Sequence, residues 1–103
     1  MSYYKAPNVT LELHDPIGTR IVKYKQAKIL PNRDTGNLII IGQNTAGLRI
    51  TNLWPYSYVK KLEILDHNNK LVTACTNPWL LEMVFNVVGD LMEVICPEEK
   101  LVK

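Results

Sequence analysis

The segment 76–97, TNPWLLEMVFNVVGDLMEVICP, is the longest and most apolar run in the sequence. Its polar residues recur at intervals of four, four and three, which is the period of a helix; they are Glu82, Asn86, Asp90 and Glu93. A helix with one narrow polar stripe must pack against a broad apolar surface, and strands upstream offer that surface. We therefore expect a sheet with one helix packed against it.

The start of this helix is clearer than its end. Asn77 can cap the free N–H groups, and Pro78 at the first helical position loses no hydrogen bond. We expect the helix to span about residues 78–88, with Gly89 ending it and residues 91–96 forming a short strand. Two alternatives remain: a helix that continues to Ile95, or a hairpin of residues 83–88 and 91–96.

Upstream of the helix, turn residues recur every eight to fourteen residues and separate short apolar or alternating segments. In residues 9–14, for example, Val9, Leu11 and Leu13 alternate with polar residues, as in a half-buried strand. We expect further strands over 19–26, 27–30, 38–41, 48–53, 59–66 and 71–75. Residues 27–30 either continue the preceding strand or begin a third strand after a bend, and the spacing of Val59, Leu62 and Leu65 leaves a short helix as the alternative for 59–66. The predicted fold is a β-rich α+β domain, an antiparallel sandwich or small barrel of about six to seven short strands with one C-terminal helix.

The length of 103 residues suits one domain, and contents of 47% apolar and 21% charged residues are typical of a folded chain. Pro7-Asn8 punctuates the first segment. We expect an N-terminal arm over residues 1–8, a single β-rich domain over 9–97 and a polar tail over 98–103.

The N-terminus lacks the apolar core of a secretory signal, and no apolar run reaches the length of a membrane span. We expect a virion or cytoplasmic protein that is not secreted and has no membrane partner. Cys75 and Cys96 have no metal-ligand spacing with each other or with a histidine, so both are predicted to be buried free thiols. Neither a metal nor another cofactor is predicted.

Positive charge is concentrated in the first part of the chain. Residues 1–61 hold nine basic and three acidic residues, whereas residues 62–103 hold three basic and seven acidic ones. Such a chain can offer a basic face to nucleic acid, or dock head to tail on a copy of itself or on an acidic partner.

The triplet Asp34-Thr35-Gly36 resembles the active-site triplet of retroviral-type aspartic proteases, β-rich homodimers in which each subunit supplies one aspartate. That family has apolar residues before the aspartate and a small residue after the glycine. Arg33 and Asn37 stand in those places here. Because Asp and Gly are also common turn residues, we interpret the triplet as a turn.

Two other motifs fail for similar reasons. Residues 42–47 have the glycine spacing of a phosphate-binding loop, but Leu48 and Arg49 replace the required lysine and hydroxyl residue. Neither His14 nor His67 stands beside a serine or cysteine in the sequence. No catalytic residue is predicted, and an enzymatic function is not expected.

Residues 54–58, WPYSY, form an aromatic corner beside Lys60-Lys61. Three interpretations are open: a protein–protein interface, base stacking with nucleic acid, and plain core packing. The predicted interface residues, which include aromatics of the arm, are Tyr3, Tyr4, Trp54, Tyr56 and Tyr58. The predicted nucleic-acid contacts are Arg20, Lys23, Lys25, Lys28, Lys60 and Lys61.

These observations favour a small non-enzymatic structural or assembly protein that works through protein–protein contacts. Compact size and a composition rich in Asn, Lys, Ile and Tyr suggest a phage or viral accessory subunit, such as one that decorates a capsid. Its partner is expected to be a second copy or a larger viral scaffold. The alternative is a nucleic-acid-binding small β-barrel that uses the basic face and the aromatic corner, and its affinity would fall steeply with salt. An enzyme and an inhibitor of a host protein rank below these two.

Overall fold

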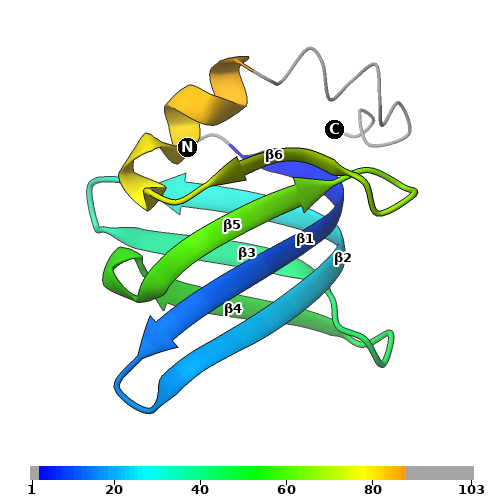
Figure 1. Ribbon diagram of the computed structural model, residues 1–103, viewed down its shortest axis with the longest axis horizontal. Coiled ribbons are helices and arrows are strands. Elements are labelled where there is room, and N and C mark those ends of the chain that lie inside the picture. The colour runs from blue at the N-terminus through cyan, green and yellow to red at the C-terminus, as the bar shows by residue number, and fades with distance from the viewer. Residues whose placement is uncertain (1–2, 88–103) are drawn as a thin grey trace.

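The predicted strands pair in the order β4-β3-β2-β1-β5-β6, forming one six-stranded antiparallel sheet (Figure 1). The computed structural model describes residues 3–87. Its strands are β1 (Tyr4–Asp15), β2 (Gly18–Asn32), β3 (Asn37–Gln43), β4 (Arg49–Pro55), β5 (Val59–Leu65) and β6 (Leu71–Cys75). Short 3-10 turns cover Tyr56–Tyr58 and Pro78–Leu80, and residues 81–87 are helical. This arrangement confirms the β-rich α+β class with one C-terminal helix.

The sheet folds over on itself because β1 and β2 are long and bend together, which carries β3 and β4 behind β1 and β5 (Figure 1). At the bend the register with β3 shifts between Lys25 and Lys28, and Gln26 takes a left-handed φ of 50°. Such a β-bulge adds twist and bends the strand. Of the two alternatives for residues 27–30, continuation of the preceding strand is confirmed, and the bend lies within that strand.

Gly42 of β3 lets the bulge approach closely. A Cβ atom on Gly42 would lie 3.1 Å from the carbonyl oxygen of Lys25 and 3.3 Å from the Cα of Ala27. Both contacts are to backbone atoms, which cannot move aside as a flexible side chain can. A glycine at this position therefore allows the close packing of β3 against the bulge.

The core lies inside the folded sheet, where alternate residues of the strands point inward. In β1 the buried residues Val9, Leu11 and Leu13 follow the predicted alternation. Leu81 and Phe85, one helical turn apart, close the end of this core, and the Phe85 ring stacks on Tyr4 at 4.2 Å between centroids. Cys75 is also buried, as predicted, and its thiol donates to the Asn77 carbonyl at 3.0 Å.

The N-terminal segment differs from the predicted arm. β1 begins at Tyr4, which pairs with Ile29, and both Ala6 and Pro7 are buried. The reason is that β2 continues beyond its bend and gives residues 4–6 a strand to pair with. Pro7 is tolerated because it lies at the irregular bend, where the ladder does not need its N–H.

Two further local predictions concern β3 and β4. The four consecutive apolar residues 38–41 predict a strand buried on both faces, but Ile39 and Ile41 face outward and are half-buried. Pro55 predicts a loop or a sheet edge for Trp54 and Pro55, and the second alternative is confirmed, because these residues end the edge strand β4. Both segments belong to the folded-over half of the sheet, whose position the local sequence pattern does not reveal.

The predicted helix start is confirmed. The Asn77 side chain accepts a hydrogen bond from the Trp79 N–H at 3.1 Å, and Pro78 opens the first turn. The helix end, the predicted strand 91–96, Cys96 and the tail 98–103 lie outside the described residues. Within residues 3–87, no helix has the length and apolarity needed to cross a membrane.

Candidate functional site

The aromatic corner packs mainly toward the interior. Trp54 is partly buried, and its Nε1 donates to the Tyr24 hydroxyl at 2.9 Å. Tyr56 is only 3% exposed, and its ring meets Trp79 edge to face at 4.7 Å between centroids. Tyr58 is partly buried against the core. Of the three interpretations of these residues, core packing describes their positions best.

The two tyrosines near the N-terminus point in different directions. Tyr4 stacks on Phe85, whereas Tyr3 is more exposed and lies under the Lys28 ammonium, 4.8 Å from the ring centroid. A cation over an aromatic face is an attractive contact. Lys28, predicted to contact nucleic acid, therefore already has an intramolecular partner.

Three more of the predicted basic contacts are ion-paired. The Arg20 Nη2 donates to Asp15 at 2.6 Å, and the guanidinium also lies 5.4 Å from the Trp54 ring centroid. Lys60 lies 3.8 Å from Glu12, and Lys61 lies 3.3 Å from Glu63. By contrast, the side chains of Lys23 and Lys25 have no partner among residues 3–87.

The Asp15 carboxylate is held in its charged form at the β1–β2 turn. Burial acts to raise its pKa, but N–H donors from Gly18 and Ile17 and the Arg20 guanidinium lower the pKa by more, so that it stays below its ordinary 3.8. The ion pair is therefore part of the turn, and the charge of Arg20 is used in binding Asp15 within the chain.

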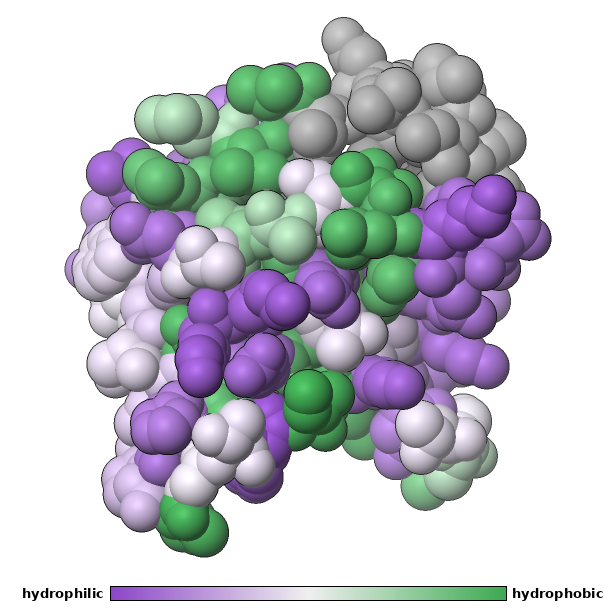
Figure 2. Space-filling view, viewed as in Figure 1, coloured by the Kyte–Doolittle hydropathy of each residue, from purple (hydrophilic) through white to green (hydrophobic). Residues whose placement is uncertain are grey.

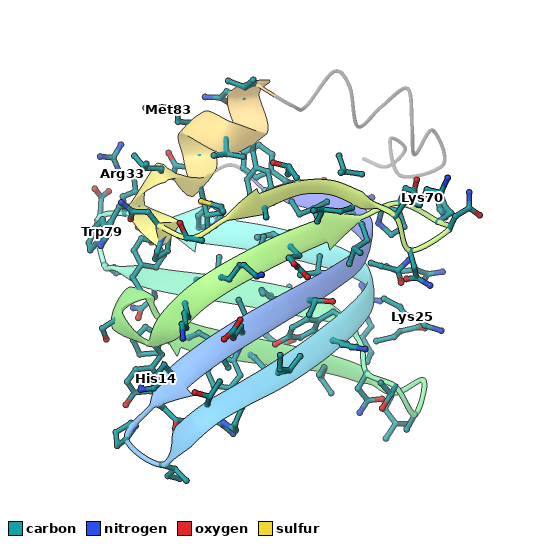
Figure 3. All side chains as sticks on the ribbon, in the orientation of Figure 1. His14, Lys25, Arg33, Lys70, Trp79 and Met83 are labelled. Atoms are coloured by element: carbon teal, nitrogen blue, oxygen red, sulfur yellow. The ribbon has the colours of Figure 1, made fainter. Side chains whose placement is uncertain are left out.

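The predicted basic and aromatic residues thus do not form one surface. The aromatic corner faces the inside of the folded sheet, whereas Lys23 and Lys25 face outward from β2. Of the six predicted basic residues, these two lack a partner within residues 3–87 and lie close together on β2, and Figure 3 shows Lys25 extending away from the sheet.

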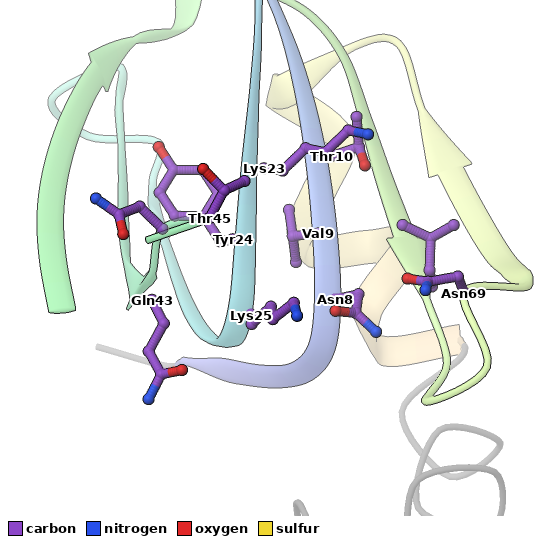
Figure 4. A pocket seen from close by; sticks show the side chains of 11 residues that line it. Asn8, Val9, Thr10, Lys23, Tyr24, Lys25, Gln43, Thr45 and Asn69 are labelled. Atoms are coloured by element: carbon purple, nitrogen blue, oxygen red, sulfur yellow. The ribbon is translucent and has the colours of Figure 1, made fainter. Parts of the chain in front are cut away.

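Lys23 and Lys25 line an open groove of about 400 Å³ on the outside of the bend. Two hairpin loops flank it, the β3–β4 loop and the β5–β6 loop, which project on the same side of the molecule (Figure 1). Lys23 lies opposite Thr10, and Lys25 opposite Asn8 (Figure 4). The lining residues are mostly polar and are Asn8, Val9, Thr10, Lys23, Tyr24, Lys25, Gln43, Asn44, Thr45, Leu65 and Asn69.

The hydrogen bonds around the groove leave donors free. Asn44 Oδ1 accepts the N–H groups of Ala46 and Leu48 at 2.9 Å each, so its amide NH₂ remains available. Asn8 instead donates its NH₂ to the Asp66 carbonyl at 2.9 Å. None of the described residues that line the groove is a carboxylate, so the two ammonium groups have no opposite charge among these residues.

A second surface is apolar. Large apolar side chains of the helical segment, Trp79, Leu80, Met83 and Val87, are between 43% and 76% exposed. Figure 2 shows apolar side chains gathered over the helix and β6, and Figure 3 shows Met83 pointing away from the sheet. The sequence signal for this surface was the narrow polar stripe of the helix. A helix that is apolar around most of its circumference leaves apolar side chains exposed when, as here, only Leu81 and Phe85 are fully buried.

The motifs that resembled catalytic sites are structural turns. Asn32 Oδ1 accepts the Asp34 N–H at 3.0 Å, Gly36 has a left-handed φ of 71°, and the Asp34 side chain is exposed. His14 is exposed and lies 3.0 Å from the Thr19 hydroxyl. Among the described residues, no three His, Cys, Asp or Glu side chains are grouped so that they could hold a metal ion.

Sequence reasoning found Lys23 and Lys25 but missed their polar neighbours in the groove. Those residues come from β1, β3 and two loops, and only the bend of β1 and β2 brings them together. No family model matches the chain, and neither a curated protein nor a solved structure is similar enough to count as a match.

Proposed function

We propose that this chain is a small non-enzymatic assembly protein that binds a second copy of itself through the apolar surface of the helix and β6. The observation that carries the proposal is the exposure of Met83 and Val87, which are 61% and 76% exposed one helical turn apart. Contiguous exposed apolar surface on a folded chain marks an interaction site.

The charges near this surface favour a second copy. Residues 59–87 hold three lysines and three carboxylates, so two such faces can meet without net repulsion. β6 is an edge strand of five residues, and its Leu71 side chain is also exposed. A two-fold dimer, in which the same patch is used twice, is the commonest way to cover such a face.

Light scattering across a range of protein concentrations tests this proposal. The wild-type chain is expected to form a dimer, and the double variant Met83→Lys/Val87→Lys is expected to be a monomer. The matched control is Leu48→Lys/Leu53→Lys, which changes two exposed leucines at β4 and should leave the dimer intact.

Two results would contradict the proposal. One is a wild-type monomer at every concentration. The other is a stability effect in a wild-type chain that is monomeric: the unfolding midpoint falls in the Met83→Lys/Val87→Lys variant but not in the Leu48→Lys/Leu53→Lys control. That result would mean that the chain's own residues 88–103, and not a second copy, cover the patch.

A narrower hypothesis concerns the setting of this assembly. Size and composition suggest a phage or virion accessory, such as a capsid decoration subunit in the virion or cytoplasm, and this part rests on the sequence alone. The nucleic-acid alternative is weakened as first stated, because the aromatic corner lies inside and four of the six basic residues have intramolecular partners.

A further inference from the structure

We propose that the groove at the bend of β1 and β2 binds the phosphate group of a phosphorylated sugar, either as a free sugar phosphate or within a nucleic acid backbone. This site is separate from the apolar surface. Its residues lie on β1 and β2, at the ends of β3 and β5 and in the two hairpin loops, and none lies on the helix.

The cationic pair supplies the phosphate contact. Lys23 and Lys25 are two residues apart on one strand, so both side chains leave the same face about 7 Å apart. Their flexible stems allow both ammonium groups to reach one tetrahedral oxyanion. Neither ammonium is neutralised within the described residues, unlike those of Lys60 and Lys61.

The bulge fixes the place of this pair. It sets Lys25 opposite Gln43 and holds the β3–β4 loop, with Asn44 and Thr45, beside the lysines. The left-handed Gln26 makes this stretch less favourable than a regular strand. Bulges are common next to binding sites, where they re-aim side chains.

The rest of the lining suits a sugar. The free NH₂ of Asn44 and the hydroxyls of Thr10 and Thr45 can bond sugar hydroxyl groups, and the carbonyl of Asn8 can accept from one. A volume of about 400 Å³ is within the range of small-ligand sites. Because Tyr24 is buried and the lining offers no exposed aromatic face for stacking, we expect contacts to phosphate and sugar rather than to a base.

Nearby charges support an anionic ligand. Residues 18–55 hold six basic residues and one acidic residue. Two carboxylates of β5 and of the turn after it have partners of their own: Glu63 pairs with Lys61, and Asp66 accepts the N–H groups of Asn68 and Lys70 at 2.8 and 3.0 Å. The field over the groove therefore attracts anions.

The test is an NMR titration of the full chain with ribose 5-phosphate, with ribose and with an eight-residue oligothymidylate. We expect ribose 5-phosphate to shift the amide signals of the groove residues and ribose to bind at least about tenfold more weakly, since it lacks the charged hydrogen-bond acceptor. Tighter binding of the oligonucleotide would identify the ligand as a strand, and equal binding would identify it as a free phosphate ester.

Matched variants locate the site. Lys23→Gln/Lys25→Gln should weaken binding at least about tenfold, whereas Lys60→Gln/Lys61→Gln, which removes the same charge outside the groove, should weaken it by less than about threefold. For the oligonucleotide, the slope of log affinity against log salt should fall by about 0.7 for each groove lysine removed. Thr45→Asp should also block binding, with Thr51→Asp on β4 as its control.

Three results would overturn the proposal. One is the absence of shifts at groove residues with all three probes. Another is equal loss in the two lysine variants, which would mean that only net charge matters. The third is binding of ribose as tight as that of ribose 5-phosphate.

Discussion

The Tyr24 hydroxyl on β2 accepts a 2.9 Å hydrogen bond from the Trp54 indole on β4, although β3 separates the two strands. The same hydroxyl donates to Asn52 Oδ1 at 2.8 Å. Gly42 of β3 makes room for this bridge, since a Cβ there would lie 3.2 Å from the Tyr24 Cβ. Burial raises the pKa of Tyr24 above its ordinary 10.0, and the Trp54 hydrogen bond offsets only part of that rise.

Removing the bridging hydroxyl should destabilise the fold. Tyr24→Phe leaves the Trp54 N–H and the Asn52 carbonyl without their partner, so we expect a loss of about 1–3 kcal/mol in the free energy of unfolding. Urea denaturation measures it. Tyr58→Phe is the control, because the Tyr58 hydroxyl has no partner among residues 3–87; equal stability of the two variants would refute the role of the bridge.

The raised pKa of Tyr24 predicts a loss of stability in alkali. The pKa of Tyr24 in the folded state lies above its value in the unfolded state. The contribution of the protonated hydroxyl to the free energy of unfolding is therefore complete below pH 10.0 and is lost as pH rises through the folded value. The urea midpoint should therefore fall as the pH is raised above 10.0. The fall should be smaller in Tyr24→Phe but not absent, because burial also raises the pKa of Tyr56. An unchanged slope would show that Tyr24 does not titrate in this way.

The lowered pKa of Asp15 predicts a loss of stability in acid. The contribution of the Asp15 charge to the free energy of unfolding is complete above the ordinary pKa of 3.8 and is lost as pH falls through the lower, folded value. Asp15→Asn should lower the unfolding midpoint at pH 7 and flatten its acid dependence. Asp66, whose pKa is lowered by the N–H groups of Lys70 and Asn68, should keep part of the dependence. The exposed Asp34→Asn is the control, and an equal effect there would contradict the prediction.

Residues of the helical segment should differ sharply in their effect on stability. Phe85→Ala removes a buried ring that stacks on Tyr4 and should cost about 3–5 kcal/mol. Val87→Ala, at an exposed position, should change stability by less than about 0.5 kcal/mol when measured on the monomer. Denaturation at low protein concentration measures both. Similar losses would mean that Val87 is covered by another part of the chain.

Local patterns predicted the strands well, because alternation such as that of Val9, Leu11 and Leu13 depends only on neighbouring residues. The Asn77-Pro78 helix start was predictable for the same reason. The arm prediction failed because the burial of Ala6 depends on pairing with Ala27, across a bend that local periodicity does not reveal. The groove could not be predicted for the same reason: Lys25 and Thr45 lie beside each other because of the bulge at Gln26, which local periodicity does not reveal.

The central position of β1 has a consequence for how the chain can fold during synthesis. β1 pairs with β2 through a two-residue turn, but its other neighbour, β5, lies far along the chain. Leu11 of β1 therefore cannot pair with Leu62 until β5 has been synthesised. Until residues 59–65 leave the ribosome, one side of β1 is an unpaired strand edge beside buried apolar residues. We therefore expect the nascent chain to be most prone to aggregation after β4 is complete and before β5 docks.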